Sequence, residues 1–222
     1  MVNIIIINNF IISLNKDQSI LENYHLAESF KLFNSSSNFN IFSVLSKEHY
    51  KLMRKRIVSL VLATDMSYHS KQYQYLKIKE DSYNIKQGTN LENIINKLGS
   101  NDLFNTQQEF LNIMLHAADI SNPTKPWDIY NKWIDRVMNE FWEQGDEERK
   151  LNLPISFLCD RNTTKISNSQ LGFIDGIVLP LLTTFIEFFP GLEFLLTNCK
   201  NNKEILIKQK DKEESNNKTT KI

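Results

Sequence analysis

Long stretches of this chain contain no helix breaker and carry apolar residues at the spacing of an α-helix. Between Ser46 and Met66 there is neither glycine nor proline. The apolar residues of this stretch recur at helical spacing: Leu52, Ile57, Leu60 and Val61. No run of useful length alternates apolar and polar residues, as a half-buried strand would. The sequence therefore predicts an all-α protein, folded as a compact multi-helix bundle.

Further helices are predicted from their end signals. A Ser19-x-x-Glu22 capping box starts one helix. A second predicted helix carries Asp119 near its end. A third runs from Pro126, which suits the first helical position, towards Gly145, which suits the position just beyond the last turn. The last long apolar helix is predicted to kink at Pro180.

Length and charge limit the classes of partner. The 222 residues suffice for one domain with a sizeable core, and 26 Lys and Arg balance 26 Asp and Glu. A chain without net charge has no basic field to attract a nucleic-acid polymer, so we expect none as a partner. The two cysteines, Cys159 and Cys199, are too few for a disulfide framework and indicate reduced thiols. A cytoplasmic location follows as the expectation.

Two apolar segments raise the question of a membrane. Residues 1–14 have no basic leading region, and asparagines interrupt them, so they fit neither a signal peptide nor a membrane span. Residues 173–189 contain Asp175, Pro180 and Glu187 and are interpreted as a core helix. We therefore expect no transmembrane segment in this chain. Residues 196–222 are polar and charged, and they are predicted to form a disordered tail.

Two groups of residues could carry chemistry. Asp119 follows an apolar helix that also contains His116, and a carboxylate there must be solvated, paired or bound to a cation. Its spacing alone favours a salt-bridged or capping role. Gln170 and Phe173 share one helix face at i and i+3. An amide suits a purine edge and an aromatic ring suits stacking on the same base, but the pattern by itself, on an apolar helix, favours core packing.

Several longer segments together resemble one known family. They are Glu22-Asn-Tyr-His25, Leu62-Ala-Thr-Asp-Met-Ser-Tyr-His69, His116-Ala-Ala-Asp-Ile-Ser-Asn-Pro-Thr124, Phe141-Trp-Glu-Gln-Gly-Asp146 and Ser169-Gln-Leu-Gly-Phe-Ile-Asp175. In this order they are similar to the catalytic domain of class I 3′,5′-cyclic-nucleotide phosphodiesterases. The resemblance implies that domain's multi-helix fold, truncated at its N-terminus. Its limits predict a poorly matched segment over 1–18, a partial catalytic domain over 19–195 and the tail over 196–222.

The resemblance also implies a metal centre and a base-binding pocket. Family members hold two divalent ions, zinc with magnesium or manganese, and Asp119 matches a metal ligand. Glu22 and Thr64 match residues that hydrogen-bond metal-bound water, although Glu22 also fits the capping box. The pocket residues that match are Gln170 at the purine edge, Phe173 for stacking, Val137 on the opposite side, and Asn122, Tyr130 and Met66 along the lining.

The family's other metal ligands have no counterpart in this sequence. Its histidines are His25, His49, His69 and His116, and none lies in a His-Asn-x-x-His segment or a His-Asp pair. One ligand of four cannot make a tight zinc site. We therefore expect the complete protein to hydrolyse cAMP, cGMP or both, and this chain alone to be inactive.

Other interpretations remain open. A non-catalytic paralogue that binds a purine nucleotide or a partner is one alternative, and a helical interaction module is another. The preference between cAMP and cGMP is open, because a Gln amide can pair with either base. A homodimer is one state to test, and any membrane anchor would lie upstream of the segments matched here.

Overall fold

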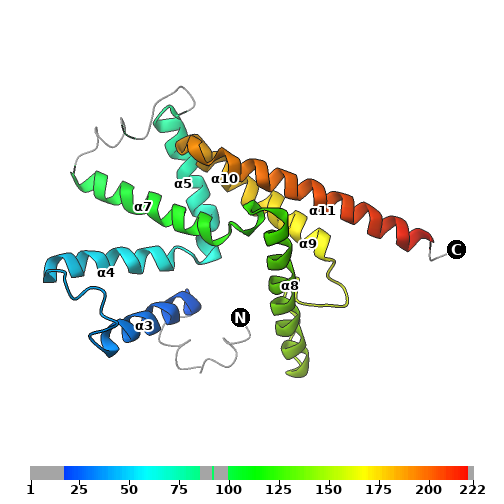
Figure 1. Ribbon diagram of the computed structural model, residues 1–222, viewed down its shortest axis with the longest axis horizontal. Coiled ribbons are helices and arrows are strands. Elements are labelled where there is room, and N and C mark those ends of the chain that lie inside the picture. The colour runs from blue at the N-terminus through cyan, green and yellow to red at the C-terminus, as the bar shows by residue number, and fades with distance from the viewer. Residues whose placement is uncertain (1–17, 86–91, 93–99, 220–222) are drawn as a thin grey trace. The chain divides into compact units, whose positions relative to one another are not determined.

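The computed structural model describes residues 18–85, 92 and 100–219 (Figure 1). Every regular element within these ranges is a helix, so the all-α prediction is confirmed. The described residues form two compact units. The first contains residues 18–75, 92 and 100–119, and the second contains residues 76–85 and 120–219.

The first unit is built around helix α4. Its elements are α3 (Ile20–Ser35), α4 (Lys47–Leu62), the short 3₁₀ helix η1 (Met66–Tyr68), the first half of α5 (His69–Ser82) and α7 (Ser100–Asp119). Helix α4 packs against both α3 and α7. On its α3 side, Arg54 lies over the Phe30 ring at 3.9 Å. On its α7 side, Ser59 and the buried Asn112 side chain are hydrogen-bonded at 3.1 Å.

The start of α3 differs from the predicted capping box. Ser19 is left-handed, with φ 43°, and its side chain makes no cap hydrogen bond. Its hydroxyl instead donates to Asp65 Oδ2 at 2.7 Å, so it is not available to the helix amides. The capping-box prediction is therefore wrong. Ser46 does cap its helix by accepting from the amide of His49.

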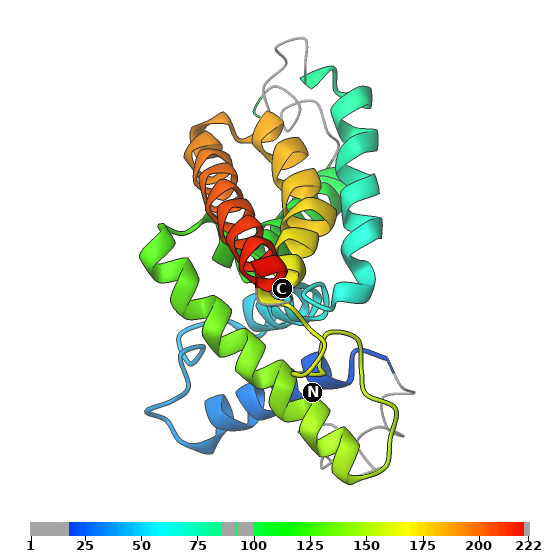
Figure 2. The ribbon, with the colours of Figure 1, turned by 90° about the vertical axis from the view of Figure 1, so that its right-hand side faces the viewer.

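The second unit encloses an apolar core between four helices. Its elements after the end of α5 are η3 (Asn122–Thr124), α8 (Trp127–Lys150), α9 (Ile166–Phe173), the π-helical turn η4 (Ile174–Val178), α10 (Leu179–Phe188), η5 (Pro190–Leu192) and α11 (Glu193–Thr219). The buried cluster comprises Tyr130, Ile134, Met138, Ile174, Val178, Leu182, Cys199 and Leu206. Its α8 members and its η4–α10 members each recur every four residues, which places each set on one helix face. Helix α11 lies alongside α9 and α10 (Figures 1 and 2).

A π-helical turn lies just before Pro180, the residue at which the sequence predicts a kink. Proline has no N–H and cannot continue the i to i−4 ladder. The turn Ile174–Val178 directly precedes it and joins α9 to α10 without ending the helical path.

Gly145 does not end its helix as predicted. Helix α8 continues to Lys150, and Gly145 is buried within it. A Cβ atom at this position would lie 2.0 Å from the carbonyl oxygen of Cys159. The glycine therefore allows the loop after α8 to approach the helix closely, and it does not serve to end the helix.

The predicted disordered tail is also wrong for most of its length, because α11 continues to Thr219. Buried residues at Cys199, Asn202 and Leu206 recur along one face and anchor the helix on the core. Ser167 Oγ also donates to Glu213 Oε2 at 3.0 Å. Tertiary packing thus stabilises as a helix a segment whose composition alone predicts disorder.

One helical stretch of the described chain is long and apolar enough to cross a membrane. It covers Ile166–Phe188 and therefore joins α9, η4 and α10. The core helices of water-soluble proteins meet the same test of length and composition. Here Ile174, Val178 and Leu182 pack in the core of the second unit.

Candidate functional site

The first unit gathers acidic residues near the ends of its helices. Glu22 lies in the first turn of α3, Asp65 caps η1, and Asp119 is the last residue of α7. Glu22 is half-buried, whereas Asp119 is exposed to solvent. The charges of Asp65, Asp119 and His25 all act on Glu22, so these side chains share one electrostatic environment.

The pKa values of Glu22 and Asp119 are both raised, whereas that of Asp65 is lowered, because the raising effect of burial is outweighed by hydrogen bonds from Ser67 and Ser19. Burial raises the pKa of Glu22, and the negative charges of Asp65 and Asp119 raise it further, against the opposing effects of a backbone hydrogen bond and His25. Burial likewise raises the pKa of Asp119, and His25 opposes the shift. A cation placed among these residues would relieve the repulsion. Sequence reasoning did not assign His25 or Asp65, although His25 follows Glu22 by three residues on the same helix.

Thr64 lies between α4 and η1, and Met66 is the first residue of η1. The Thr64 hydroxyl donates to the Val61 carbonyl at 2.8 Å, which is the usual local bond at a helix end. Met66 begins η1 and its side chain is 45% exposed. The Thr64 hydrogen bond and the exposure of Met66 neither support nor contradict the roles that the resemblance implies for these two residues.

The described residues do not fit a metal centre by themselves. No group of three His, Cys, Asp or Glu side chains within 18–85, 92 and 100–219 lies close enough together to hold an ion. Asp119 remains one candidate ligand, and zinc needs about four.

Two histidines form a buried pair close to this region in sequence. His69 Nδ1 and His116 Nε2 are 3.0 Å apart, and His116 is fully buried. Among the residues that the structure describes, none is hydrogen-bonded to His116 Nδ1. Burial, followed by the charge of His69, lowers the pKa of His116 to about 4. The lowered pKa keeps His116 neutral at pH 7.

In the second unit, Tyr130 and Gln170 form the centre of the predicted pocket. The Tyr130 hydroxyl donates to Gln170 Oε1 at 3.0 Å, and burial raises the pKa of this phenol, which keeps its proton in place. Gln170 Nε2 contacts the weak acceptor Met138 Sδ at 3.7 Å. One end of the amide is thus fixed by a strong partner and the other has only a weak one.

Three further residues of the predicted pocket come from elements of this second unit, whereas Met66 belongs to the first unit. Asn122 begins η3, and its buried Oδ1 accepts no hydrogen bond from the described part of the chain, which leaves an acceptor for a further donor. Val137 is half-buried on α8, and Phe173 is half-buried at the end of α9.

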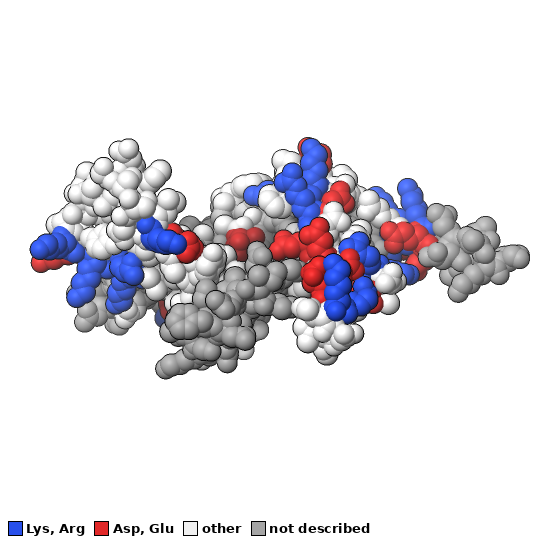
Figure 3. Space-filling model, turned by 90° about the horizontal axis from the view of Figure 1, so that it is seen from below, with Lys and Arg blue, Asp and Glu red and all other residues white. Residues whose placement is uncertain are grey.

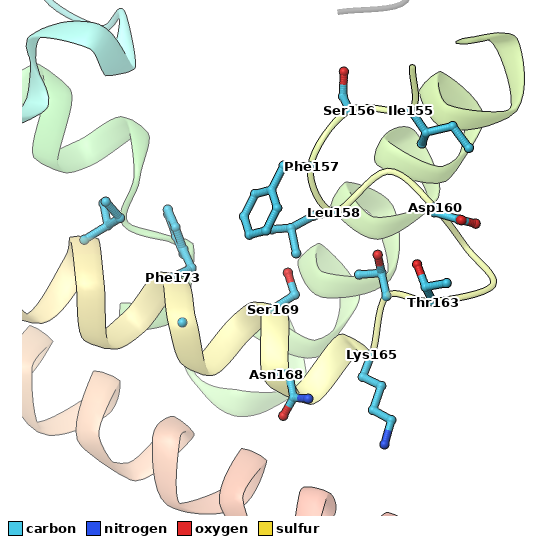
Figure 4. A pocket seen from close by; sticks show the side chains of 13 residues that line it. Ile155, Ser156, Phe157, Leu158, Asp160, Thr163, Lys165, Asn168, Ser169 and Phe173 are labelled. Carbon is cyan, nitrogen blue, oxygen red and sulfur yellow. The ribbon is translucent and has the colours of Figure 1, made fainter. Parts of the chain in front are cut away.

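A hollow of about 920 Å³ lies between α9 and the loop that follows α8. Figure 4 shows the loop residues Phe157 and Leu158 on one side and the α9 residues Ser169 and Phe173 on the other. Phe173 lines the hollow, whereas Gln170 between these α9 residues turns towards Tyr130 and Met138. Sequence reasoning did not assign this loop, whose run of turn-forming residues gives no chemical signal.

Comparison with known proteins places these features in a family. The family model described as 3′5′-cyclic nucleotide phosphodiesterase matches residues 5–199. The chain belongs to this phosphodiesterase family. The match includes every site residue discussed above, from Glu22 to Phe173.

Individual relatives agree with the family. The chain is 38% identical over 198 residues to a probable 3′,5′-cyclic-AMP phosphodiesterase, pde-4, of Caenorhabditis elegans, covering 89% of this chain and 28% of that protein. It is 37% identical to the rat 3′,5′-cyclic-AMP phosphodiesterase 4C, covering 89% and 37%. The chain thus spans about a third of the length of these curated relatives.

A solved structure supports the fold. The phosphodiesterase domain of the RhoPDE fusion protein from Salpingoeca rosetta superposes with a TM-score of 0.78 at 25% identity. The match covers 92% of this chain and 61% of that one. The predicted resemblance to a phosphodiesterase catalytic domain is therefore confirmed.

The surface charge of the described residues is mixed in sign on the face shown in Figure 3. Figure 3 shows a face on which acidic and basic side chains lie interspersed, without a broad field of one sign. Equal numbers of acidic and basic residues in the whole chain agree with this view. Electrostatic attraction of a nucleic-acid polymer requires a basic patch or stripe instead.

Proposed function

We propose that this phosphodiesterase-family chain acts in the hydrolysis of 3′,5′-cyclic nucleotides to 5′-monophosphates, and that its second unit binds the purine base. The observation that carries the proposal is the Tyr130–Gln170 hydrogen bond. A buried amide held at its oxygen presents its N–H groups in a fixed direction, and Phe173 offers an aromatic ring one helical turn away. The relatives' names make cAMP the first substrate to test and cGMP the second.

Divalent metal ions belong to the proposal as cofactors of the complete enzyme. Asp119 is the ligand that this chain contributes, with Glu22 and Thr64 as hydrogen-bonding neighbours of metal-bound water. Because a single carboxylate does not hold zinc tightly, we expect this 222-residue chain to bind nucleotide without substantial turnover.

Calorimetric titration with cAMP and cGMP tests the binding proposal. Tyr130→Phe removes the donor to Gln170 and should weaken binding about 10-fold, the effect of losing one well-placed hydrogen bond. Gln170→Ala should weaken binding at least as much. Tyr68→Phe is the matched control, since Tyr68 is 38% exposed, belongs to the first unit and is not among the residues proposed to bind the base.

A hydrolysis assay with added zinc and magnesium tests the second part. Binding without turnover supports a base-binding role for this chain, and it also describes the alternative of a non-catalytic paralogue. Substantial turnover would contradict the expected inactivity. Unchanged affinity in Gln170→Ala would contradict the base-binding role and favour a helical interaction module.

A further inference from the structure

A buried carboxylate in α8 holds the loop that walls the hollow. Glu148 is 5% exposed. Its Oε2 accepts from the Ser156 amide at 2.7 Å, and its Oε1 accepts from the Ser156 hydroxyl at 2.6 Å. Gln144, one turn earlier on α8, also donates to Oε1 at 2.8 Å. Two of the three donors therefore belong to one loop residue, eight positions further along the chain.

Burying a charged carboxylate is unfavourable unless strong donors replace the lost water. Hydrogen bonds to a charged group are roughly twice as strong as those between neutral groups. Displacing Ser156 from Glu148 would leave the carboxylate with one neutral amide donor in a buried place. The position of Ser156 is therefore strongly determined by Glu148.

A second contact fixes the loop three residues later. The Cys159 carbonyl lies against the backbone of Gly145, where no side chain would fit. Between the two contacts, Leu158 adopts a left-handed conformation with φ 65°. A branched residue with positive φ is strained and persists only where its surroundings hold it. Ser156 and Cys159 flank the strained residue on both sides.

Surface ion pairs also join the loop to α8, but they are exposed. Arg149 contacts Asp160 at 2.9 Å, and Arg161 pairs with Asp146. The side chains of both arginines are more than 40% exposed. Such pairs contribute little to stability because water and salt screen them. The buried contact at Glu148 is the stronger attachment.

The loop held in this way forms one wall of the hollow beside the proposed base site. Phe157 and Leu158 face the α9 residues Ser169 and Phe173 across it (Figure 4). Phe157 is 88% exposed, so contacts of its own side chain do not fix its place. We propose that Glu148 is a positioning residue that, through Ser156, sets the loop wall of the hollow that Phe173 of the proposed base site also lines. This inference rests on the proposed function for its ligand, but the loop contact itself does not.

Glu148→Gln tests the proposal with almost no change of shape. The amide replaces one acceptor oxygen with a donor, which then meets the donors of Ser156 or Gln144. Glu147→Gln is the matched control, since Glu147 pairs with Lys150 on the exposed side of α8. We expect amide hydrogen exchange in residues 151–165 to become about 10-fold faster in Glu148→Gln and to stay unchanged in the control.

Nucleotide affinity is measured in parallel, well below the unfolding temperature of each variant. We expect cAMP to bind several-fold more weakly to Glu148→Gln, and Ser156→Ala, which keeps the backbone donor, to give a smaller change in the same direction. If Glu148 had only a structural role, Glu148→Gln would lower the unfolding temperature and leave both the nucleotide affinity and the loop exchange rate unchanged. That outcome would overturn the proposal.

The two proposals fail in different ways. If the unmodified chain binds neither cAMP nor cGMP, the base-binding function fails, and loop exchange in Glu148→Gln still decides whether Glu148 anchors the loop. If the chain binds nucleotide and Glu148→Gln leaves loop exchange unchanged, the anchoring role fails alone.

Discussion

At the scale of single residues, the protons of His69 and His116 can be placed by their partners. His116 Nδ1 is buried without a partner, and an N–H there would lack an acceptor. The less costly arrangement leaves Nδ1 bare and has His116 Nε2–H donate to His69 Nδ1, 3.0 Å away. A second proton on His116 would have no acceptor, which agrees with its lowered pKa of about 4.

This arrangement makes stability depend on pH in a defined direction. The pKa of His116 is about 4 in the folded chain, against about 6.5 when unfolded. Between these values the unfolded chain binds more protons, so stability falls as pH decreases from about 6.5 to 4. We expect the free energy of unfolding to lose about 2 kcal/mol from this residue between pH 7 and pH 5. Urea titrations at both pH values measure it.

His116→Gln separates this contribution from those of the acidic residues. The variant should be less stable than the unmodified chain at pH 7, because a buried pair is lost. The difference in unfolding free energy between the unmodified chain and the variant should shrink by about 2 kcal/mol at pH 5, because only the unmodified chain loses the contribution of His116 as the pH falls. A difference that is equal at both pH values would show that His116 titrates normally.

At the scale of elements, α11 is tied to the turn that precedes α8. Asn202 is 2% exposed, and its Nδ2 donates to the carbonyls of Pro123 and Lys125 at 2.8 and 2.7 Å. These carbonyls belong to η3 and its cap, next to the pocket residue Asn122. A polar residue of the presumed tail thus supports part of the proposed site.

Asn202→Ala should destabilise the chain by about 1–3 kcal/mol, since it leaves two carbonyls without their donor. Asn201→Ala, at the exposed neighbouring position, should change stability by less than about 0.5 kcal/mol. Chemical denaturation gives both values. Equal effects of the two substitutions would mean that helix propensity, and not the contact with η3, determines the result.

At the scale of the whole molecule, the length of α11 sets where the fold can be shortened. Removing residues 207–222 keeps Cys199, Asn202 and Leu206 and should leave a cooperative thermal transition. Removing residues 196–222 takes all three from the core and should abolish that transition. Differential scanning calorimetry of both shortened chains tests this, and similar transitions would restore the original domain limit at residue 195.

Helix class, the approximate positions of most helices and the family could be predicted because breaker-free amphipathic segments and long ordered motifs carry that information locally. The errors arose where a distant partner decides the outcome. Ser19 is engaged by Asp65, Gly145 receives the Cys159 carbonyl, and Asn202 binds the turn at η3. The Tyr130–Gln170 bond lies within the predicted pocket set, but the role of Glu148 could not be inferred, because its donors are a property of the folded loop.

The two thiols lie in different packed regions. Cys159 packs against Gly145, and Cys199 lies on the face of α11 that packs in the core. Burial raises the pKa of both, to about 11 for Cys199, so neither supplies much of the reactive thiolate at pH 7. A labelling reagent can therefore reach each sulfur only after its own surroundings open. The two labelling rates would report separately how often the loop and the C-terminal helix detach, without any introduced probe.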